Sequence, residues 1–365
     1  MLNVLHIGSH FGNIGDNASH HVVHEAIRQR TPARFRTLEI RRFYANAGEL
    51  SFDEDFVRHA NTFDLVLFGG GNFLEPVHAY SSSATTLDLG PEAMAGLRVP
   101  FVLNAVGFDP GKGEEDALLE RFRTWVDVVA DHPRLMVNLR DDGSLEDFRR
   151  LVGPLEDFGF GLVPDPGLFF RPEGDFPFTD REYLAVNLAG DLEAIRYPEA
   201  GAKEELFAAL RGLMAELPEE AALVLVPHVT MDVTLLGEFL RDSSDWGSRK
   251  RLLLAPLLQG YDDFWKPFDV YRKAAGIVTN RFHSLLCNLQ YEIPMAVLGN
   301  YPKIPKTLER MELTDLLYRG GGTEELVGKL LEDGDETRHH RPALVERMRE
   351  EFEASVDRIL AFAGA

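Results

Sequence analysis

Short apolar runs alternate with longer amphipathic stretches along most of the chain, and this alternation limits the possible folds more than any other feature. The runs in the first half lie at 2–8, 35–40, 64–70, 100–107 and 134–140. They are too short for helices and are flanked by Gly, Pro and Asp, which is typical of buried parallel strands. Helical patterns over 16–30 and 116–132 lie between them. The alternation therefore predicts βαβ units, with a parallel sheet covered by helices on both faces.

A segment with four prolines, residues 164–182, interrupts the alternation. Further strands are then predicted at 182–190, 221–228, 251–256, 274–280 and 293–299. Helices are predicted at about 200–217, 230–241, 262–273 and 281–291, and one long helix over 341–365. Because 365 residues are long for a single core, we expect two α/β domains, 1–172 and 173–365. Each is expected to be Rossmann-like and doubly wound, with the two domains facing a cleft.

The composition narrows the possible partners and compartments. A formal net charge of −21 disfavours non-specific binding to nucleic acid or to an anionic membrane. A single cysteine, Cys287, excludes an internal disulfide framework and fits a reducing compartment. The sequence shows neither a signal peptide nor the roughly 18 uninterrupted apolar residues of a membrane span. We therefore expect a cytoplasmic protein with no integral membrane segment and no nucleic-acid partner.

The first predicted strand leads into the sequence GSHFGNIGDNASH. Gly12, Asn13 and Gly15 allow a ligand to approach the backbone closely, and Asp16 is placed to cap the following helix. The glycine spacing does not match the dinucleotide fingerprint, and no Walker lysine follows. The segment is therefore either a ligand-binding turn or the tight turn that any α/β fold needs.

Three histidines in the predicted first helix raise the question of a metal site. His20 and His24 lie one helical turn apart, with His21 beside them. Zinc takes further ligands, and neither an HExxH motif nor an acidic cluster accompanies these histidines. We therefore favour a packed or solvated helix face and expect no metal site.

The third predicted strand ends in three glycines, Gly69, Gly70 and Gly71, followed by Asn72. Successive glycines cost backbone entropy and cannot fill a core. Either a ligand or a closely packed helix must approach this backbone, and we favour the ligand.

Two polar side chains lie at the ends of other predicted strands. Arg140 emerges from the fifth strand just before Asp141 and Asp142, so it either pairs with these aspartates or contacts an anion. His228 ends a strand of the second domain and either faces the cleft or packs inside. Cys287 lies among leucines and is expected to be a buried structural thiol.

The strongest group of candidate residues lies within 274–311. Asn280 is the expected N-cap of a helix, which leaves Arg281 and His283 at its open end. That end carries about +0.5 charge and unsatisfied N–H groups, so the two side chains complete a site for a carboxylate or phosphate. Lys303 adds a third positive group. The alternative is a set of salt bridges, but a cation at a helix N-terminus is unfavourable without an anion.

Taken together, these motifs resemble the polysaccharide pyruvyl transferase family. The resemblance covers roughly residues 8–311 and rests on GNIGDNA, DLVLFGGGNF, NLRDDGSLEDF, VPDPG, VPH with Asp232 downstream, and TNRFHSLL followed by IPMAVLGNYPK. The Arg-x-His at Arg281 and His283 is the most specific piece. The chain departs from the family pattern at Asn17, where an acidic residue is common, and at Phe282, where leucine is common.

The resemblance implies a GT-B-like pair of domains, phosphoenolpyruvate as donor and a cell-surface or exopolysaccharide sugar as acceptor. It places the acceptor in the first domain and the donor in the second, with donor contacts at Arg281, His283 and Arg140 and with no cofactor. His283 is the candidate proton donor or phosphate contact, and Asp16 is a candidate acceptor base. The further predicted substrate-binding residues are Gly12, Asn13, Asp16, Gly69, Gly70, Gly71, Asn72, His228, Asn280, Ser284 and Lys303.

Two other functions stay open. A GT-B glycosyltransferase would share the fold and the acceptor class but would bind a nucleotide sugar. A non-catalytic carbohydrate-binding relative would bind glycan and release no phosphate from any donor.

Overall fold

The computed structural model describes residues 1–110, 115–243, 245–332, 334 and 336–365, and the chain folds as two compact units. Unit 1 comprises Met1–Phe11, Ser19–Pro166 and Arg347–Ala365, and unit 2 comprises Gly12–Ala18 and Gly167–Glu346. The proline-rich segment 164–182 is the predicted connection between the domains, and the division after Pro166 falls within it, six residues before the predicted bound at 172. Two segments, 12–18 and 347–365, also belong to the unit that is distant from them in sequence, which local periodicity cannot reveal.

The sheet of unit 1 contains six described strands, all paired in parallel, in the order β2-β1-β3-β4-β5-β6. These strands are β1 (Leu2–Gly8), β2 (Ala33–Glu39), β3 (Leu65–Gly69), β4 (Phe101–Val106), β5 (Leu135–Arg140) and β6 (Gly161–Val163). The switch point of this sheet lies between β1 and β3, because the chain adds β2 on one side of β1 and adds β3 and the later strands on the other side.

The sheet of unit 2 also has six described parallel strands, in the order β12-β11-β10-β7-β8-β9. They are β7 (Tyr183–Asn187), β8 (Ala222–Leu225), β9 (Leu252–Leu254), β10 (Gly276–Thr279), β11 (Met295–Leu298) and β12 (Leu317–Tyr318). Counted from β7, this is the 3-2-1-4-5-6 order of a Rossmann fold, with its switch point between β7 and β10. The predicted pair of doubly wound α/β units is thereby confirmed.

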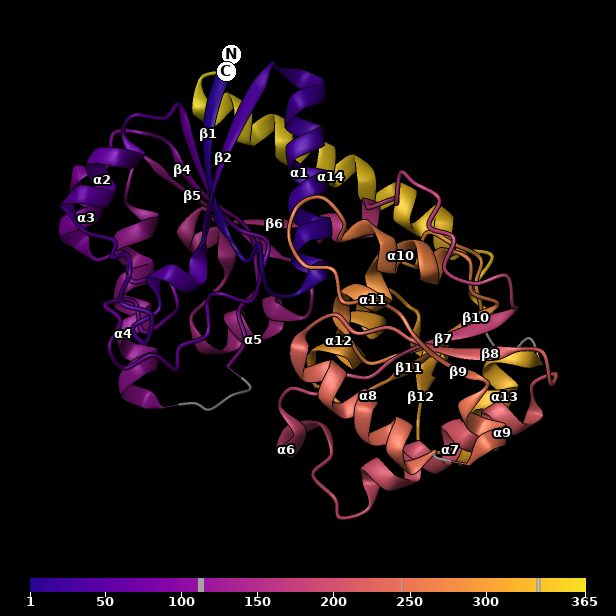
Figure 1. Cartoon of the computed structure of the whole chain (residues 1–365). Helices are drawn as coiled ribbons and strands as arrows, with labels where there is room; N and C mark the ends of the chain where they lie inside the picture. The colour runs from indigo at the N-terminus through magenta and orange to yellow at the C-terminus, as the bar shows by residue number, and fades with distance from the viewer. Residues whose placement is uncertain (111–114, 244, 333, 335) are drawn as a thin grey trace. The chain divides into compact units, whose positions relative to one another are not determined.

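Helices flank the sheet of each unit (Figure 1). Those of the first half are α1 (Ile14–Arg30), α2 (Glu54–Ala60), α3 (Pro91–Gly96), α4 (Asp116–Ala130) and α5 (Ser144–Leu151). Those of the second half are α6 (Glu193–Arg196), α7 (Ala202–Glu216), α8 (Thr230–Asp242), α9 (Trp246–Arg249), α10 (Trp265–Arg272), α11 (Phe282–Leu286), α12 (Lys303–Arg310), α13 (Gly322–Leu331) and α14 (Arg341–Ala363). The predicted terminal helix is therefore present as α14.

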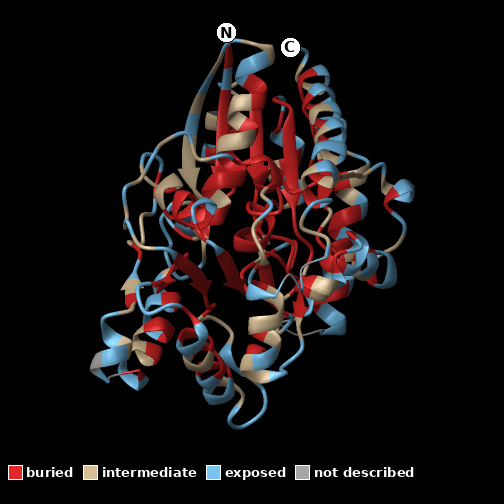
Figure 2. Cartoon of the chain, turned by 90° about the vertical axis from the view of Figure 1, so that its right-hand side faces the viewer, coloured by how far each residue is buried: buried red, intermediate tan, exposed pale blue. Residues whose placement is uncertain are grey.

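The end of α14 lies beside α1 within unit 1. Arg30, at the end of α1, contacts Glu353 and Asp357 of α14 at 2.5 Å each. These ion pairs, together with buried Val356 and Ile359, explain why residues 347–365 belong to unit 1. The strands themselves form the cores: the inner strands are buried along nearly their whole length, whereas β2, β6, β9 and β12 include residues that are partly or fully exposed (Figure 2).

Two short strands were not predicted, β6 and β12. They have three and two residues, and neither presents an apolar run longer than the loops around it. A strand this short is specified by its neighbour in the sheet and not by its own sequence.

Four histidines fill the switch point of unit 1. His6 lies on β1, His10 follows it, and His20 and His24 come from α1. The ring centroids of His6 and His20 lie 4.5 Å apart and those of His10 and His20 4.7 Å apart. His6 Nδ1 and His24 Nε2 share a hydrogen bond of 2.7 Å. We call these four residues the histidine cluster.

The glycines at this switch point make room for the ring of His20. A Cβ added to Gly8 would lie 2.9 Å from that ring, and a Cβ added to Gly70 would lie 2.6 Å from it. His20 Nε2 also donates a 2.9 Å hydrogen bond to the carbonyl of Gly69. The cavity left between them measures only about 10 Å³. Helix packing therefore accounts for these glycines without a ligand.

The histidine cluster predicts that the protein loses stability between pH 6.5 and 5. Burial lowers the pKa of His6, His20 and His24 well below the ordinary value and that of His10 to about 4. The unfolded chain binds these protons near pH 6.5 and the folded chain does not, so the free energy of unfolding must fall as the pH falls. For His10 alone the loss between pH 8 and 5 is on the order of 2 kcal/mol.

Urea unfolding of wild type and His10→Phe at pH 8, 6.5 and 5 measures this loss. The variant should show a smaller fall in stability, by about the contribution of one histidine. His340→Gln, which changes an exposed histidine, serves as the control and should follow wild type. An identical fall in wild type and His10→Phe would contradict the assignment.

Candidate functional site

The switch point of unit 2 gathers four charged side chains that three segments supply. Asp191 follows β7, Arg281 follows β10, and Asp232 lies in the first turn of α8. Arg196 ends the short helix α6. Ligands of doubly wound sheets bind at the carboxyl ends of the strands beside such a switch point. We call these residues the charged quartet.

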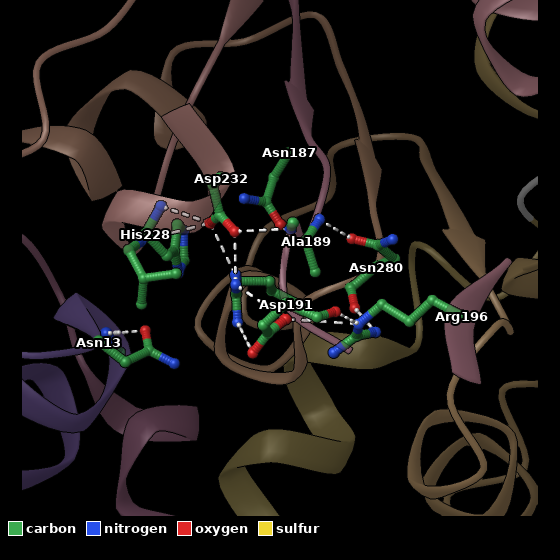
Figure 3. Close-up of polar contacts among 12 residues, drawn as sticks. Asn13, Asn187, Ala189, Asp191, Arg196, His228, Asp232 and Asn280 are labelled. Atoms are coloured by element: carbon green, nitrogen blue, oxygen red, sulfur yellow. Dashed lines mark hydrogen bonds and ion pairs between the residues drawn. The ribbon is translucent and has the colours of Figure 1, made fainter. Parts of the chain in front are cut away.

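Arg281 and Asp232 form the buried centre of the quartet. Arg281 donates from Nε to Asp232 Oδ2 at 2.7 Å and from Nη2 to Asp232 Oδ1. The backbone N–H of Gly190 donates to Oδ1 at 3.0 Å, and that of His228 donates to Oδ2 at 2.9 Å (Figure 3). Asp232 is fully buried and Arg281 is 6% exposed. Asp232 is therefore an internal counter-ion for Arg281.

Opposite effects set the pKa values of this pair. Burial by itself would raise the pKa of Asp232, but the charge and hydrogen bonds of Arg281 hold it below its ordinary value. Burial would likewise lower the pKa of Arg281, but Asp232 and Asp191 raise it. Both side chains therefore carry full charge at neutral pH.

Asp191 links Arg281 to Arg196. Its Oδ1 lies 3.1 Å from Arg281 Nη2 and 3.4 Å from Arg196 Nε. Arg196 is held further by a hydrogen bond from Nη1 to the carbonyl of Asn280, at 3.2 Å, and by the ring of Tyr301, 4.8 Å below its guanidinium carbon. Burial is the main cause that lowers the pKa of Arg196.

Asn280 ties the quartet to the sheet and does not cap a helix. Its Oδ1 accepts the backbone N–H of Ala189 at 2.6 Å, and its Nδ2 donates to the hydroxyl of Tyr197 at 3.2 Å. The N-cap of α11 is Arg281, and this helix ends at Leu286. The predicted cap at Asn280 was therefore wrong by one residue, and the helix predicted at about 281–291 is present but ends at Leu286. Since two aspartates already balance Arg281, the electrostatic argument for an external anion at this helix end no longer holds.

His283 and Asp16 approach each other within unit 2. His283 Nδ1 lies 3.8 Å from Asp16 Oδ1, and His283 is 4% exposed. A Cβ added to Gly15 would lie 2.2 Å from the Cβ of His283, so only glycine allows this approach. The side chain of Asn13 accepts the backbone N–H of Gly15 at 2.9 Å. The predicted cap at Asp16 was therefore wrong, because α1 begins at Ile14 and Asp16 lies inside its first turn.

The other predicted residues of unit 2 have contacts of their own. The Gly12 carbonyl accepts a hydrogen bond from Gln259. His228 is fully buried, and its Nε2 contacts the Tyr271 hydroxyl at 2.9 Å. Burial lowers the pKa of His228 to about 3, so it is neutral at physiological pH. Ser284 is fully buried in α11, and Lys303 Nζ lies 5.1 Å from the ring centre of Phe282.

The predicted residues of unit 1 have structural partners of their own. Arg140 is 3% exposed and pairs with Asp142 at 2.6 Å and Asp165 at 2.9 Å. Asn72 Nδ2 donates to Glu75 at 2.7 Å and to Asp109 at 3.0 Å. A Cβ on Gly69 would lie 2.3 Å from the carbonyl of Asn104, and one on Gly71 would lie 2.6 Å from the ring of Phe73.

Sequence reasoning missed Asp191 and Arg196 and assigned no role to Asp232. Asp191 carried one available signal, because it follows a glycine at the carboxyl end of a predicted strand. Arg196 carried none, since its place depends on the fold of the loop between β7 and α7.

Among the described residues, no group of His, Cys, Asp or Glu side chains is arranged to hold a metal ion. None of the described helices combines the length and apolar character that a membrane span requires.

Comparisons with known proteins agree with this fold. The family model described as polysaccharide pyruvyl transferase matches residues 11–301. The sequence matches no curated protein. S. aureus MnaA in its structure with UDP is 15% identical, with a TM-score of 0.56 over 98% of this chain and 97% of MnaA. Anabaena HepE in complex with UDP-glucose is 12% identical, with a TM-score of 0.55 over 99% of this chain and 98% of HepE.

The UDP-forming α,α-trehalose-phosphate synthase from Burkholderia vietnamiensis is 10% identical, with a TM-score of 0.53 over 99% of this chain and 97% of the synthase. At these identities the likeness concerns the fold alone. It confirms the predicted GT-B-like, two-domain α/β fold.

Removal of the inner carboxylate of the quartet should unfold unit 2 or weaken it strongly. Asp232→Asn leaves the buried guanidinium of Arg281 without its main partner, which typically costs about 3–5 kcal/mol. Thermal and urea unfolding measure the loss, and Asp262→Asn, at an exposed aspartate, is the control. A variant as stable as wild type would show that Asp232 does not hold the quartet together.

Proposed function

Because the chain belongs to the polysaccharide pyruvyl transferase family, we propose that it transfers the pyruvyl group of phosphoenolpyruvate to two hydroxyls of one sugar. The acceptor belongs to a cell-surface or exopolysaccharide, the product is a cyclic ketal, and phosphate is released. The observation that supports this proposal best is the imidazole–carboxylate pair of His283 and Asp16, placed beside the charged quartet.

The reaction consists of one protonation and two additions. A proton adds to the methylene carbon of phosphoenolpyruvate, which becomes a methyl group, and C2 becomes oxocarbenium-like. One sugar hydroxyl adds to C2 and the C2–O bond to phosphate breaks. A second hydroxyl of the same sugar then closes the ring. The two hydroxyl protons balance the proton taken up by the methyl group and the proton carried by the departing phosphate.

His283 is the proposed proton donor. An imidazole ring can both give and take up a proton, as this role requires. Asp16 lies on the Nδ1 side of the ring, so we propose Nε2 as the nitrogen that acts on the substrate. This changes the role considered for Asp16, from acceptor base to the carboxylate that orients His283.

In this proposal the guanidinium groups of Arg281 and Arg140 provide the positive charge that stabilises the donor and its departing phosphate. Asp232 fixes the guanidinium of Arg281, and Asp142 and Asp165 fix that of Arg140, so each is held in one orientation before the donor arrives. Such preorganised charge needs no rearrangement when negative charge develops on the departing phosphate. Lys303, at the start of α12, is the proposed third cation.

His283→Gln and His283→Ala test the proton transfer. Neither variant can give a proton, so phosphate release from phosphoenolpyruvate in the presence of glycoside acceptors should fall roughly 10²- to 10⁴-fold. Phosphoenolpyruvate should still bind to His283→Gln, as calorimetry would show. His340→Gln, at an exposed position, is the control. Near wild-type turnover in both folded variants would refute the role of His283.

The same protein samples can separate the alternative functions. A thermal-shift series compares phosphoenolpyruvate with UDP, GDP and CMP, since a ligand at 100 times its dissociation constant adds about 2.7 kcal/mol of stability. Stabilisation by a nucleotide alone would favour a nucleotide-sugar glycosyltransferase. Binding of glycan with no phosphate release would favour a non-catalytic relative.

Asp16→Asn tests the orientation of His283. The amide removes the negative charge on the Nδ1 side and keeps the shape of the side chain. We expect kcat to fall about tenfold or more while the KM for phosphoenolpyruvate changes little, because the ring loses orientation and not its donor contacts. Asp262→Asn is the matched control. A larger change in KM than in kcat would place Asp16 among the substrate contacts.

A further inference from the structure

The carboxylate of Asp191 lies between two guanidinium groups. Its oxygens are 3.1 and 3.4 Å from Arg281, and Oδ1 is 3.4 Å from Arg196 (Figure 3). Asp191 is 31% exposed, whereas Arg281 and Arg196 are 6% and 7% exposed. The carboxylate thus reaches two buried cations from the solvent side.

The two aspartates around Arg281 are not equivalent. Asp232 is fully buried, accepts the 2.7 Å bond from Arg281 Nε and is fixed by three backbone N–H groups. Asp191 makes the longer contacts. Asp232 is therefore the permanent partner of Arg281, and Asp191 holds the outer edge of the same guanidinium more weakly.

One side of the Arg196 guanidinium has no hydrogen-bond acceptor from the described part of the chain. Its Nε and Nη1 are engaged by Asp191 and Asn280, but Nη2 has no hydrogen-bond acceptor among the described residues. The side chain also lines a cavity of about 800 Å³, together with Tyr197, Asn300 and Tyr318. The Arg196 side chain is thus more than nine-tenths buried, and the described residues satisfy only part of its guanidinium.

The segment that carries Asp191 has features of a movable loop. Leu192, the next residue, has a left-handed backbone with φ +54°, which costs a non-glycine residue on the order of 1 kcal/mol or more. The helix that follows, α6, has only four residues. The strained backbone thus lies directly next to the carboxylate that reaches the two arginines.

We infer that Arg281 and Arg196 form an anion site, that Asp191 occupies it in the ligand-free protein, and that an incoming carboxylate or phosphate takes the place of Asp191. The exchange preserves charge, because one anion replaces another between the same two cations. The cavity beside Arg196 then holds the remainder of the ligand. The identification of this ligand as phosphoenolpyruvate rests on the proposed function, whereas the anion site itself does not.

Calorimetric titration of Asp191→Asn with phosphoenolpyruvate tests the exchange. Without a competing carboxylate, the dissociation constant should fall at least about tenfold, equivalent to roughly 1.4 kcal/mol. Asp191→Ser provides a second removal of the charge, and Asp191→Glu, which keeps the charge, should bind like wild type. Arg196→Gln should raise the dissociation constant at least about tenfold. Asp262→Asn controls for the loss of a surface aspartate.

Two smaller probes show which anionic group enters the site. Pyruvate carries only the carboxylate and inorganic phosphate only the phosphate. The group that binds in the exchange should gain affinity in Asp191→Asn and lose it in Arg196→Gln. Thermal unfolding adds a second readout, since Asp191→Asn should be less stable than wild type in buffer and should recover when that anion is added.

Unchanged affinity for all three anions in folded Asp191→Asn and Asp191→Ser would overturn the inference and make Asp191 a structural partner. This outcome is independent of the proposed function. A wild type that releases phosphate while Asp191 variants bind normally would retain pyruvyl transfer and remove the exchange. A gain in anion affinity without phosphate release from wild type would retain the anion site and remove pyruvyl transfer.

Discussion

The buried ion pair of Arg281 and Asp232 is the interaction on which the candidate site depends. It joins the carboxyl end of β10 to the first turn of α8, and through Gly190 it also fixes the loop after β7. Burial of two charges is expensive unless their geometry and remaining hydrogen bonds compensate. Here three backbone N–H groups complete the shell of Asp232, so the pair is held in one arrangement. A Cβ on Gly190 would lie 2.1 Å from the carbonyl of Met231, so the loop comes this close to α8 only with glycine.

The two switch points of the chain are used differently, although both sheets are parallel and doubly wound. In unit 1 the neutral ring of His20 fills the crevice between β1 and β3, where it packs against Gly8 and Gly70. In unit 2 the corresponding crevice between β7 and β10 holds charged groups, one of which is partly exposed. A crevice filled by side chains leaves no room for a ligand. An ion pair at the end of a strand, in contrast, can exchange one of its partners for a charged ligand. Apart from Arg140, the residues proposed to act on the donor therefore belong to unit 2, and the proposed acceptor role of unit 1 rests on the family resemblance.

The sequence allowed the prediction of the fold class and ten of the twelve described strands, because each buried parallel strand has its own apolar run. It did not allow prediction of β6 or β12, which are too short to carry a pattern. The sequence predicts the Arg-x-His segment as the centre of the candidate site, but it led to a wrong view of the electrostatics there. Helical spacing suggested a cation at a bare helix end, whereas Asp232 and Asp191, about 50 and 90 residues away in sequence, balance Arg281. Counter-ions that the fold brings together from distant segments leave no local signature.

The position of Asp16 shows the same limit and gives it a mechanistic meaning. Asp16 belongs to the N-terminal part of the chain, so a division by sequence position assigns it to the first domain. Its segment, Gly12–Ala18, instead belongs to unit 2, where Gly15 packs directly on His283. The carboxylate and the imidazole of the proposed proton donor thus come from opposite ends of the sequence but from one compact unit. A pair within one unit keeps its 3.8 Å spacing however the units move, so the proposed proton donor stays oriented before any donor or acceptor binds.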